Sequence, residues 1–241
     1  MVAEDIIELL RKRESPENKA GMARFGINVE QAFGVPVTEL RKIAREIGKN
    51  HQLALELWST GFHEAKIMAV LVAEPKKLDR ETMESWARDF DSWDITDLSM
   101  IHLFRKNPEA HSLAVSWAGR QEEFVKRAGF ALMATLAVHD KKSGDQFFKE
   151  YLALVEDASE DERNYVKKAV NWALRQIGKR NFHLREKAIE TAERIALKNS
   201  RSARWIASDA LRELKGEKVE EMLLKKEGIK KEGSSSRRQE L

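Results

Sequence analysis

The sequence predicts an all-α protein in which pairs of helices stack into a curved, single-domain solenoid. Two observations carry this prediction: apolar residues recur at helical spacing from end to end without the alternation of a strand, and one segment is repeated at a fixed distance. The composition agrees, because 42% hydrophobic residues with only 12 Gly and 4 Pro among 241 exclude a disordered or fibrous chain.

Several segments show the helical pattern clearly. Apolar residues at i, i+3, i+4 and i+7 predict helices at residues 40–47, before Gly48, and at 83–90 and 184–195. Another helix is expected to begin near Ser92 and to end before Pro108. Ser159 and Glu162 have the spacing of a capping box, which predicts a helix start there and a helix running to Gly178.

Self-similarity identifies the type of solenoid. Residues 125–133 (VKRAGFALM) align with residues 166–174 (VKKAVNWAL) at an offset of 41, and weaker echoes occur at 63–72 and 203–211. Repeats of about 40 residues made of helix pairs are typical of HEAT-like proteins, whose concave face is suited to binding another large molecule. We expect one HEAT-like domain over residues 1–227, followed by a flexible basic tail at 228–241.

Charge is distributed unevenly although the net charge is only +3. Residues 74–97 contain eight acidic and four basic side chains, whereas residues 163–215 contain fourteen basic and five acidic ones. Such a basic excess is typical of a nucleic-acid-binding surface, although a solvated, highly charged helical face has the same composition.

Several classes of site are excluded by the residues that the sequence lacks. There is no cysteine, so disulfides and thiolate sites are absent, and the six histidines are scattered without a metal-ligand motif. Glycine-rich nucleotide loops and nucleophile elbows are also missing. The longest apolar run, residues 67–73, is too short to cross a bilayer. We therefore expect a cytoplasmic protein without metal, cofactor or membrane contact.

Trp93 and Asp97 are the first candidates for chemistry. They stand four residues apart on the helix expected after Ser92, so their side chains emerge on one face, an aromatic plate beside a carboxylate. Asp94 is explained by the helix macrodipole, but Asp97 lies one turn further in and gains less from it. The alternative is a solvated aspartate and a core tryptophan.

Cations and a second tryptophan occupy matching places in the repeats. Lys66, Arg127 and Lys168 correspond, so stacking should align them in a stripe that can follow a phosphate backbone, or else leave them as ordinary exposed side chains. Trp172 lies one turn beyond Lys168 and can form an aromatic platform with Trp93 or fill a packing gap. Trp205 is expected in the core.

These residues resemble a known family, the HEAT-like DNA alkylation repair proteins of the alkylpurine DNA glycosylase type. The resemblance spans residues 20–214. It depends on five motifs taken together: Gly34-Val35-Pro36 followed by Leu40-Arg41-Lys42, Gly61-Phe62-His63-Glu64-Ala65-Lys66, Trp93-Asp94-Ile95-Thr96-Asp97, Lys126-Arg127-Ala128, and Asn171-Trp172-Ala173-Leu174-Arg175.

The resemblance implies hydrolysis of the N-glycosidic bond of a cationic N3- or N7-alkylated purine in duplex DNA, without obligatory base flipping. Asp97, Trp93 and Trp172 match the catalytic residues of the family. The expected DNA-binding residues are Arg127, Lys66, Lys126, Lys168 and Arg175. A cationic purine leaves without a general acid, so the carboxylate of Asp97 would stabilise the oxocarbenium-like sugar and orient the water. The two tryptophans would cradle the sugar and Arg127 would hold a phosphate. No cofactor is needed, and we expect a monomer.

Two alternatives remain open. Some relatives of this fold bind unusual DNA structures without excising bases, which would make the protein a non-catalytic DNA-binding repeat protein. A protein-binding HEAT scaffold is the other alternative, although such a scaffold would more naturally present an apolar concave stripe than Lys66, Arg127 and Lys168.

Overall fold

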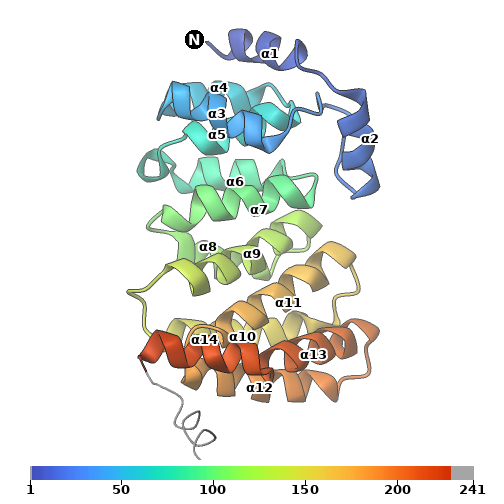
Figure 1. Cartoon of the computed structure of the whole chain (residues 1–241), viewed down its shortest axis with the longest axis vertical. Coiled ribbons are helices and arrows are strands. Elements are labelled where there is room, and N and C mark those ends of the chain that lie inside the picture. The colour runs from blue at the N-terminus through green and yellow to red at the C-terminus, as the bar shows by residue number, and fades with distance from the viewer. Residues whose placement is uncertain (1, 229–241) are drawn as a thin grey trace, which may run out of the picture.

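The computed structural model describes residues 2–228, and this part of the chain forms fourteen α-helices and three short 3-10 helices with no strand. The helices stack in chain order, from α1 at one end to α12, α13 and α14 at the other (Figure 1). The predicted all-α helical-repeat solenoid is confirmed. Apart from Gly228, the tail predicted at 228–241 lies outside the described residues.

The helices divide into those before and those after the middle of the stack. The first half contains α1 (Ala3–Arg11), α2 (Pro16–Arg24), α3 (Val37–Ile47), α4 (His51–Ser59), α5 (His63–Val72), α6 (Arg80–Arg88) and α7 (Trp93–His102). The second half contains α8 (Ala110–Ala118), α9 (Glu123–His139), α10 (Asp145–Asp157), α11 (Asn164–Gly178), α12 (Phe182–Ala196), α13 (Arg201–Leu214) and α14 (Glu217–Glu227). The 3-10 helices are η1 (Pro75–Lys77), η2 (Phe104–Lys106) and η3 (Ala158–Glu160).

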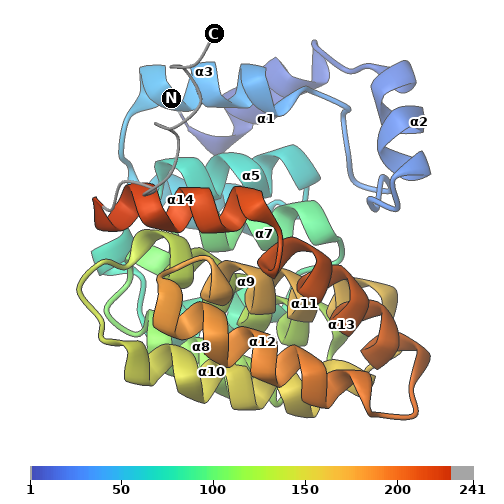
Figure 2. The same ribbon diagram turned by 60° about the horizontal axis from the view of Figure 1, so that its bottom comes forward.

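Two layers of helices run along the stack. In the inner layer α3, α5, α7, α9, α11 and α13 each contact the next. The outer layer contains α4, α6, α8, α10 and α12, and Figure 2 shows α8, α10 and α12 together on one side. Hydrogen bonds between the N-terminal halves of α5 and α7, and of α9 and α11, show that these inner helices start at one edge of the molecule. Side chains from consecutive repeats therefore meet there.

Three of the predicted helices are confirmed with small differences in their ends. Residues 40–47 lie in α3, which ends at Gly48, a residue with φ of +73°. Residues 83–88 lie in α6, whose first turn is capped by the side chain of Asp79. Residues 184–195 lie in α12, and α11 ends at Gly178 as predicted. The repeated segments at 125–133 and 166–174 lie in α9 and α11, which pack against each other.

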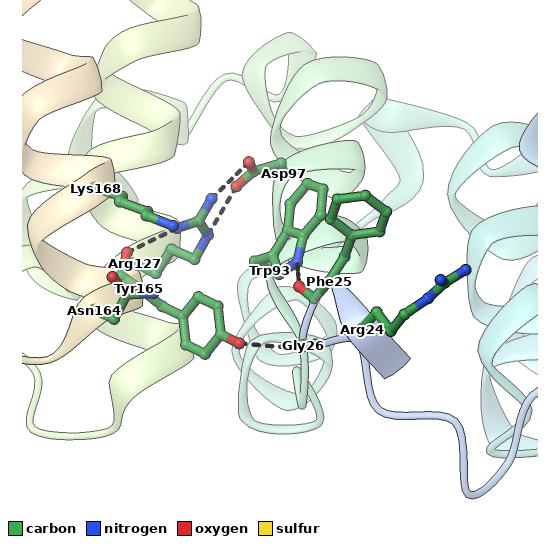
Figure 3. A pocket seen from close by; sticks show the side chains of 9 residues that line it. All are labelled: Arg24, Phe25, Gly26, Trp93, Asp97, Arg127, Asn164, Tyr165 and Lys168. Carbon is green, nitrogen blue, oxygen red and sulfur yellow. Dashed lines mark hydrogen bonds and ion pairs between the residues drawn. The ribbon is translucent and has the colours of Figure 1, made fainter. Parts of the chain in front are cut away.

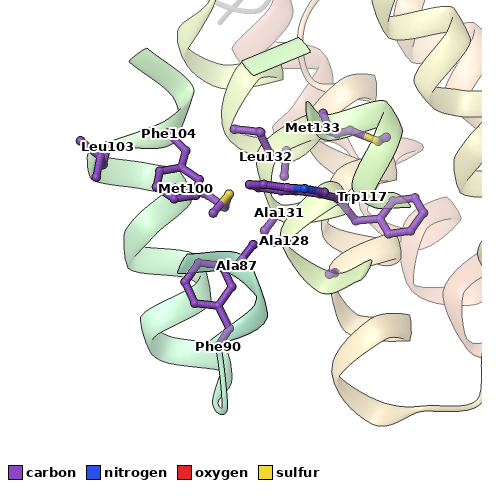
Figure 4. Packing of buried hydrophobic residues seen from close by; sticks show 14 of the residues in the cluster. Ala87, Phe90, Met100, Leu103, Phe104, Trp117, Ala128, Ala131, Leu132 and Met133 are labelled. Atoms are coloured by element: carbon purple, nitrogen blue, oxygen red, sulfur yellow. The ribbon is translucent and has the colours of Figure 1, made fainter. Parts of the chain in front are cut away.

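The single helix predicted between Ser92 and Pro108 is wrong, because α7 ends at His102 and is followed by the 3-10 helix η2. The break turns Phe104 into the core, where its ring lies 6.4 Å from that of Trp86 and 5.7 Å from that of Trp117 (Figure 4). Burial of this ring favours the break over a continuous helix, since a large aromatic side chain contributes much of the hydrophobic stabilisation of a core.

The capping box predicted at Ser159 and Glu162 is also wrong. Ser159 lies in η3 and its hydroxyl donates to the carbonyl of Glu156, while α11 starts only at Asn164. Glu162 instead caps the next inner helix, accepting hydrogen bonds from the hydroxyl of Ser200 and the backbone N–H of Ser202. The carboxylate thus joins two repeats across 40 residues of sequence.

A buried glutamate holds α2 and its loops against the stack. Glu64, in the first turn of α5, is 1% exposed and accepts hydrogen bonds from the backbone N–H groups of Phe33, Gly34 and Val35. Gly34 has φ of +80°, and a Cβ there would lie 2.4 Å from the carbonyl oxygen of Ser15, so only glycine fits. None of the residues of α2 is buried, so this anchor determines where α2 lies.

We predict that Glu64→Ala lowers the free energy of unfolding by about 2–4 kcal/mol, because it leaves buried N–H groups without an acceptor. The melting temperature followed by circular dichroism should fall by roughly 5–15 °C. Glu46→Ala, on the exposed side of α3, is the control and should melt near the wild-type temperature. Melting of Glu64→Ala at the wild-type temperature would show that this anchor is unimportant.

Candidate active site

A cavity of about 590 Å³ opens where the first turns of α7, α9 and α11 meet the loop that follows α2 (Figure 3). Side chains from four helices and one loop surround it. Its lining residues are Arg24, Phe25, Gly26, Trp93, Asp97, Arg127, Asn164, Tyr165 and Lys168. The structure therefore brings together four of the residues singled out in the sequence, Trp93, Asp97, Arg127 and Lys168.

The centre of the cavity wall is an ion pair between α7 and α9. Arg127 donates from Nε to Oδ1 of Asp97 at 3.0 Å and from Nη2 to Oδ2 at 2.7 Å. Its Nη1 donates to the backbone carbonyl of Tyr165 at 2.7 Å, which adds α11 to the network. Arg127 is 5% exposed, so the anionic partner expected for a buried arginine is Asp97. The bidentate geometry fixes the plane of the carboxylate.

The environment of Asp97 alters its acidity. Burial raises the pKa of this carboxyl above its ordinary value, and the charge and hydrogen bonds of Arg127 offset only part of that increase. Nearby Asp94 raises the pKa further. A carboxylate with a raised pKa accepts a proton more readily, and perturbed carboxyls in open cavities are typical of active sites. Asp97 is therefore the group in this cavity best suited to proton transfer or to stabilising positive charge.

The loop after α2 closes one side of the cavity and is held at two points. Trp93 donates from Nε1 to the carbonyl of Phe25 at 3.0 Å, and the hydroxyl of Tyr165 donates to the carbonyl of Gly26 at 3.1 Å. Gly26 has φ of +72°, and a Cβ there would lie 2.1 Å from the hydroxyl of Tyr165. Phe25 itself is 75% exposed at the mouth of the cavity. The indole N–H of Trp93 thus positions the loop, and its ring lines the wall.

Sequence reasoning missed Phe25, Gly26 and Tyr165. The contact between Tyr165 and Gly26 spans 139 residues, so no local spacing indicates it. A Gly after an apolar residue in a short loop was the only available signal.

The start of α7 is braced by a second ion pair. His63 of α5 lies 2.9 Å from Asp94 through Nε2, and the hydroxyl of Ser92 donates to the same carboxylate at 2.9 Å. Burial, the largest influence, would lower the pKa of His63, but the hydrogen bond and charge of Asp94 outweigh it and the pKa is raised. For Asp94, burial acts to raise the pKa, while the contacts with His63 and Ser92 bring it below its ordinary value.

The remaining charges of the cavity favour an anionic ligand. Arg127 and Asp97 neutralise each other, whereas Arg24 and Lys168 form no ion pair with any carboxylate of the described residues. Both are exposed. The cavity therefore carries two uncompensated positive charges at its mouth, as a site for a phosphate backbone would.

The other predicted site residues lie outside this cavity. Lys66 is 9% exposed, donates to the carbonyl of Asp89 and lies over the ring of Trp58. Lys126 pairs with Asp161 at 3.0 Å, and Arg175 pairs with Glu213 at 2.5 Å. Their internal partners compete with DNA, and their DNA-binding roles stay predictions.

Trp172 and Trp205, the other tryptophans considered in the sequence analysis, lie outside the cavity lining. Trp172 packs partly buried against the core and is not among the lining residues of the cavity. It follows Lys168 by one turn on the same face of α11, so it lies next along that wall. Trp205, expected in the core, is 41% exposed and lies under the ammonium of Lys167, 5.7 Å away. That expectation was wrong because Trp205 lies on the open face of α13.

Two other kinds of site are absent from residues 2–228. This stretch contains no group of three or more His, Asp or Glu side chains placed to hold a metal ion. None of its helices combines the length and the apolar character needed to span a bilayer.

Comparison with known proteins identifies the family. The sequence profile of the DNA alkylation repair enzymes matches residues 6–214, which is most of the chain. The chain belongs to the DNA alkylation repair enzyme family. Membership assigns it to DNA repair and confirms the family that its motifs resemble.

Relatives of this DNA alkylation repair protein include two uncharacterised proteins from Listeria. Lin0241 of Listeria innocua is 25% identical over 169 residues, covering 68% of this chain and 72% of the relative. Lmo0209 of Listeria monocytogenes is 21% identical over 166 residues, with the same coverage of both chains. Neither relative has a known activity that could be carried over.

A solved structure shares the fold of the repair protein, with a TM-score of 0.74 and 22% identity over 88% of this chain and 95% of that one. It is described as belonging to a new family of proteins related to the HEAT-like repeat DNA glycosylases, with affinity for branched DNA structures. At this identity the likeness shows a HEAT-like repeat fold.

We predict that His63→Gln lowers the stability of the repair protein more at pH 5.5 than at pH 8.5. The raised pKa of His63 means that its stabilising contribution is present below the unfolded value of about 6.5 and is lost as pH rises through the folded pKa. The lowered pKa of Asp94 means that its contribution is present above about 4 and is lost as pH falls through the folded pKa. Melting curves at both pH values test this, and an equal difference between variant and wild type at the two would contradict it.

Proposed function

We propose that this repair protein is a DNA glycosylase that hydrolyses the N-glycosidic bond of cationic N3- or N7-alkylated purines in duplex DNA. The observation that carries the proposal is the placement of Asp97, with its raised pKa, beside the ring of Trp93 in an open cavity with two free cations. Family membership supports DNA alkylation repair as the setting.

The reaction makes modest chemical demands on the protein. The bond between C1′ of deoxyribose and the purine nitrogen breaks, and its electron pair leaves with the base, which becomes neutral because alkylation had made it cationic. Water adds to C1′ and loses one proton, leaving an abasic site and the free base. No general acid, metal or redox partner enters this balance. The difficult species is the sugar, which gains positive charge as the base departs.

Asp97 is suited to two tasks in this reaction: stabilising the positive charge of the sugar and accepting the proton that the water loses. A carboxylate about 4 Å from the developing charge, at an effective dielectric constant of about 20, gives at most roughly 4 kcal/mol of attraction, or about a thousandfold in rate if felt only in the transition state. The paired guanidinium of Arg127 reduces this attraction. The raised pKa of Asp97 favours acceptance of the proton that the water loses. Arg127 acts as a positioning residue, because its bidentate contact orients the carboxylate.

The aromatic side chains would bind the sugar and stabilise its charge. The negative face of an indole attracts a cation, and Trp93 already lines the cavity beside Asp97. Trp172 would extend the same surface along α11, one turn beyond Lys168, so that DNA lying across α7 and α11 meets both rings. This surface is open, which supports access to a nucleotide without extrusion of its base into a closed pocket.

Lys168 and Arg24 would hold the phosphates that flank the damaged nucleotide. Both lie at the cavity mouth and neither has a carboxylate partner within the described stretch. Arg127 keeps one free N–H on each Nη atom for such a contact, but it is only 5% exposed. The phosphate role first predicted for Arg127 therefore suits Lys168 better.

A second candidate function is binding of branched DNA without base excision. Two observations favour it: the structural neighbour is described as having affinity for branched DNA, and Trp172 does not line the cavity. In this function the ion pair of Asp97 and Arg127 would be a structural contact between α7 and α9. Measuring base release separates the two candidates.

We predict that the purified protein releases 7-methylguanine or 3-methyladenine from methylated duplex DNA and that Asp97→Asn lowers the rate of release by about two to three orders of magnitude. The amide keeps the shape of the side chain but lacks its charge, so DNA binding should change little. Chromatography of the freed base measures the rate, and fluorescence anisotropy measures the binding.

Glu81→Gln is the matched control, since it removes one exposed carboxylate from α6 and should release base at the wild-type rate. No release by folded, DNA-binding wild-type protein would exclude the glycosylase and leave branched-DNA binding. Wild-type rates in Asp97→Asn would remove Asp97 from the mechanism.

We also predict that Lys168→Gln makes duplex binding less dependent on salt. Loss of one phosphate contact should decrease the slope of log K against log salt by about 0.9. Lys149→Gln, on the outer helix α10, removes the same charge away from the cavity and should leave the slope unchanged. Equal slopes for wild type and Lys168→Gln would show that Lys168 meets no phosphate.

A further inference from the structure

A second group of cations lies at the other ends of the inner helices, far along the chain from the cavity residues. We name it the basic edge. Most of it lies at or just after the C-terminal ends of helices, and Arg41 joins it from the middle of α3. Its members are Arg41, Lys49, Arg105, Lys106, Lys141, Arg180 and Lys226, with His102 and His139 among them.

Contacts between neighbours show that the basic edge is continuous. Arg41 of α3 reaches from Nη2 to within 3.2 Å of Nε2 of His102 on α7, two helices that are separated by α5. Both side chains must therefore lie over the surface of the inner layer. Further along, Lys226 of α14 donates to the carbonyl of Lys179 at 2.7 Å, next to Arg180. Between these contacts, burial and the charges of Arg105, Lys141 and Lys106 lower the pKa of His139, and burial and the charges of Lys141 and Arg180 lower the pKa of Lys226. The edge thus extends from α3 to α14.

Within residues 2–228, none of the seven cations of the basic edge forms an ion pair, although the charge of Glu74 acts on Lys49. Their hydrogen bonds go to carbonyl groups, except that Arg41 contacts the ring of His102. Lys49 donates to the carbonyls of Leu71 and Ala73, at 2.7 and 2.9 Å. Arg180 donates to the carbonyls of Ala137 and Ser143, at 3.2 and 2.9 Å. These bonds place the cations at helix ends without cancelling their charge.

The cations repel one another. Burial and the positive charge of Arg41, followed by that of Lys106, lower the pKa of His102. Burial lowers the pKa of Lys106, and the charge of Arg105 lowers it further. A cation at a helix C-terminus is favoured by the macrodipole, which explains single members of the edge. The macrodipole does not explain why cations from different repeats lie so close that each disfavours the protonation of its neighbours. An anionic ligand would remove this repulsion.

The cavity and the basic edge lie at opposite ends of the inner helices. Trp93 and His102 are the first and last residues of α7, so they lie about 14 Å apart along its axis, and Arg127 and His139 are separated by about 18 Å on α9. These separations exceed the groove widths of B-DNA, about 6 and 12 Å, so long side chains would have to lean over the inner surface to contact both backbones. In Figure 1, α2 lies at one side of the stack and α14 ends at the opposite side.

We propose that the basic edge binds the phosphates of the second strand of the duplex, the strand opposite the one whose nucleotide enters the cavity. This inference depends on DNA as the ligand, as in the proposed function, but not on base excision. One strand follows Arg24 and Lys168, and the other crosses the C-terminal ends of the inner helices. Contacts to both phosphate backbones would fix the position of the duplex relative to Asp97. An open cavity could then hold one nucleotide in a defined place.

The test uses the double variant Lys106→Gln/Lys141→Gln. Both side chains are exposed and form no hydrogen bond or ion pair within residues 2–228, so their replacement leaves the fold intact. We expect weaker duplex binding by about ten- to a hundredfold at 0.1 M salt and a decrease of about 1.8 in the salt slope. Binding of a labelled single strand, which would contact only the cavity side, should stay at the wild-type level. Anisotropy of labelled duplex, single strand and four-way junction measures all three.

The control is Lys149→Gln/Lys187→Gln, which removes the same charge from the outer helices α10 and α12 and should bind duplex as the wild type does. Equal duplex affinity and slope in the wild type and in Lys106→Gln/Lys141→Gln would overturn the proposal. Loss of junction binding with duplex binding intact would also overturn it, because the edge would then serve another DNA arm. If the wild type bound no DNA at all, the proposed function itself would fail together with this inference.

Discussion

The candidate site depends on one buried guanidinium that joins three consecutive inner helices. Arg127 of α9 binds the carboxylate of Asp97 on α7 and the backbone carbonyl of Tyr165 on α11. A buried charge is tolerated only where partners compensate it, so the spacing of these helices and the orientation of the carboxylate are fixed together. The same contact that holds the stack at this point also orients the carboxylate of Asp97. In the proposed function Arg127 would therefore position Asp97, in place of the phosphate contact that the family resemblance implies.

The repeat architecture explains why charges gather at two edges of one surface. Inner helices with parallel directions present their first turns along one edge and their last turns along the other, so residues at equal repeat positions become neighbours. At the first edge the neighbours are mixed in charge, and they form the pairs His63–Asp94, Asp97–Arg127 and Lys126–Asp161. At the last edge the seven cations of the basic edge form no ion pair within residues 2–228. Pairing at one edge stabilises the stack, and its absence at the other leaves charge available to a ligand.

Much of this arrangement could be predicted from the sequence. Helical spacing and the offset of 41 residues indicate the solenoid, because each pattern is local or strictly repeated. Trp93 and Asp97 could be placed on one face of α7 for the same reason. The loop at Phe25 and Gly26 could not be predicted, since its two anchors lie 68 and 139 residues away. Local rules also failed where a distant partner outweighed them: Glu162 caps α13 in place of its own helix, and burial of Phe104 ends α7 early.

The loop after α2 is held by hydrogen bonds that also fix one wall of the cavity. Its position is set by Glu64 at one end and by Trp93 and Tyr165 at the other, and the tryptophan is itself a wall of the cavity. Because α2 buries no residue of its own, these few hydrogen bonds are its main attachment to the stack. An indole whose N–H is fixed by a backbone carbonyl cannot rotate freely, so its face stays directed at the position where the sugar would lie. In the proposed function, the N-terminal segment would therefore contribute through the orientation of Trp93, even though it supplies no acidic or basic group to the reacting atoms.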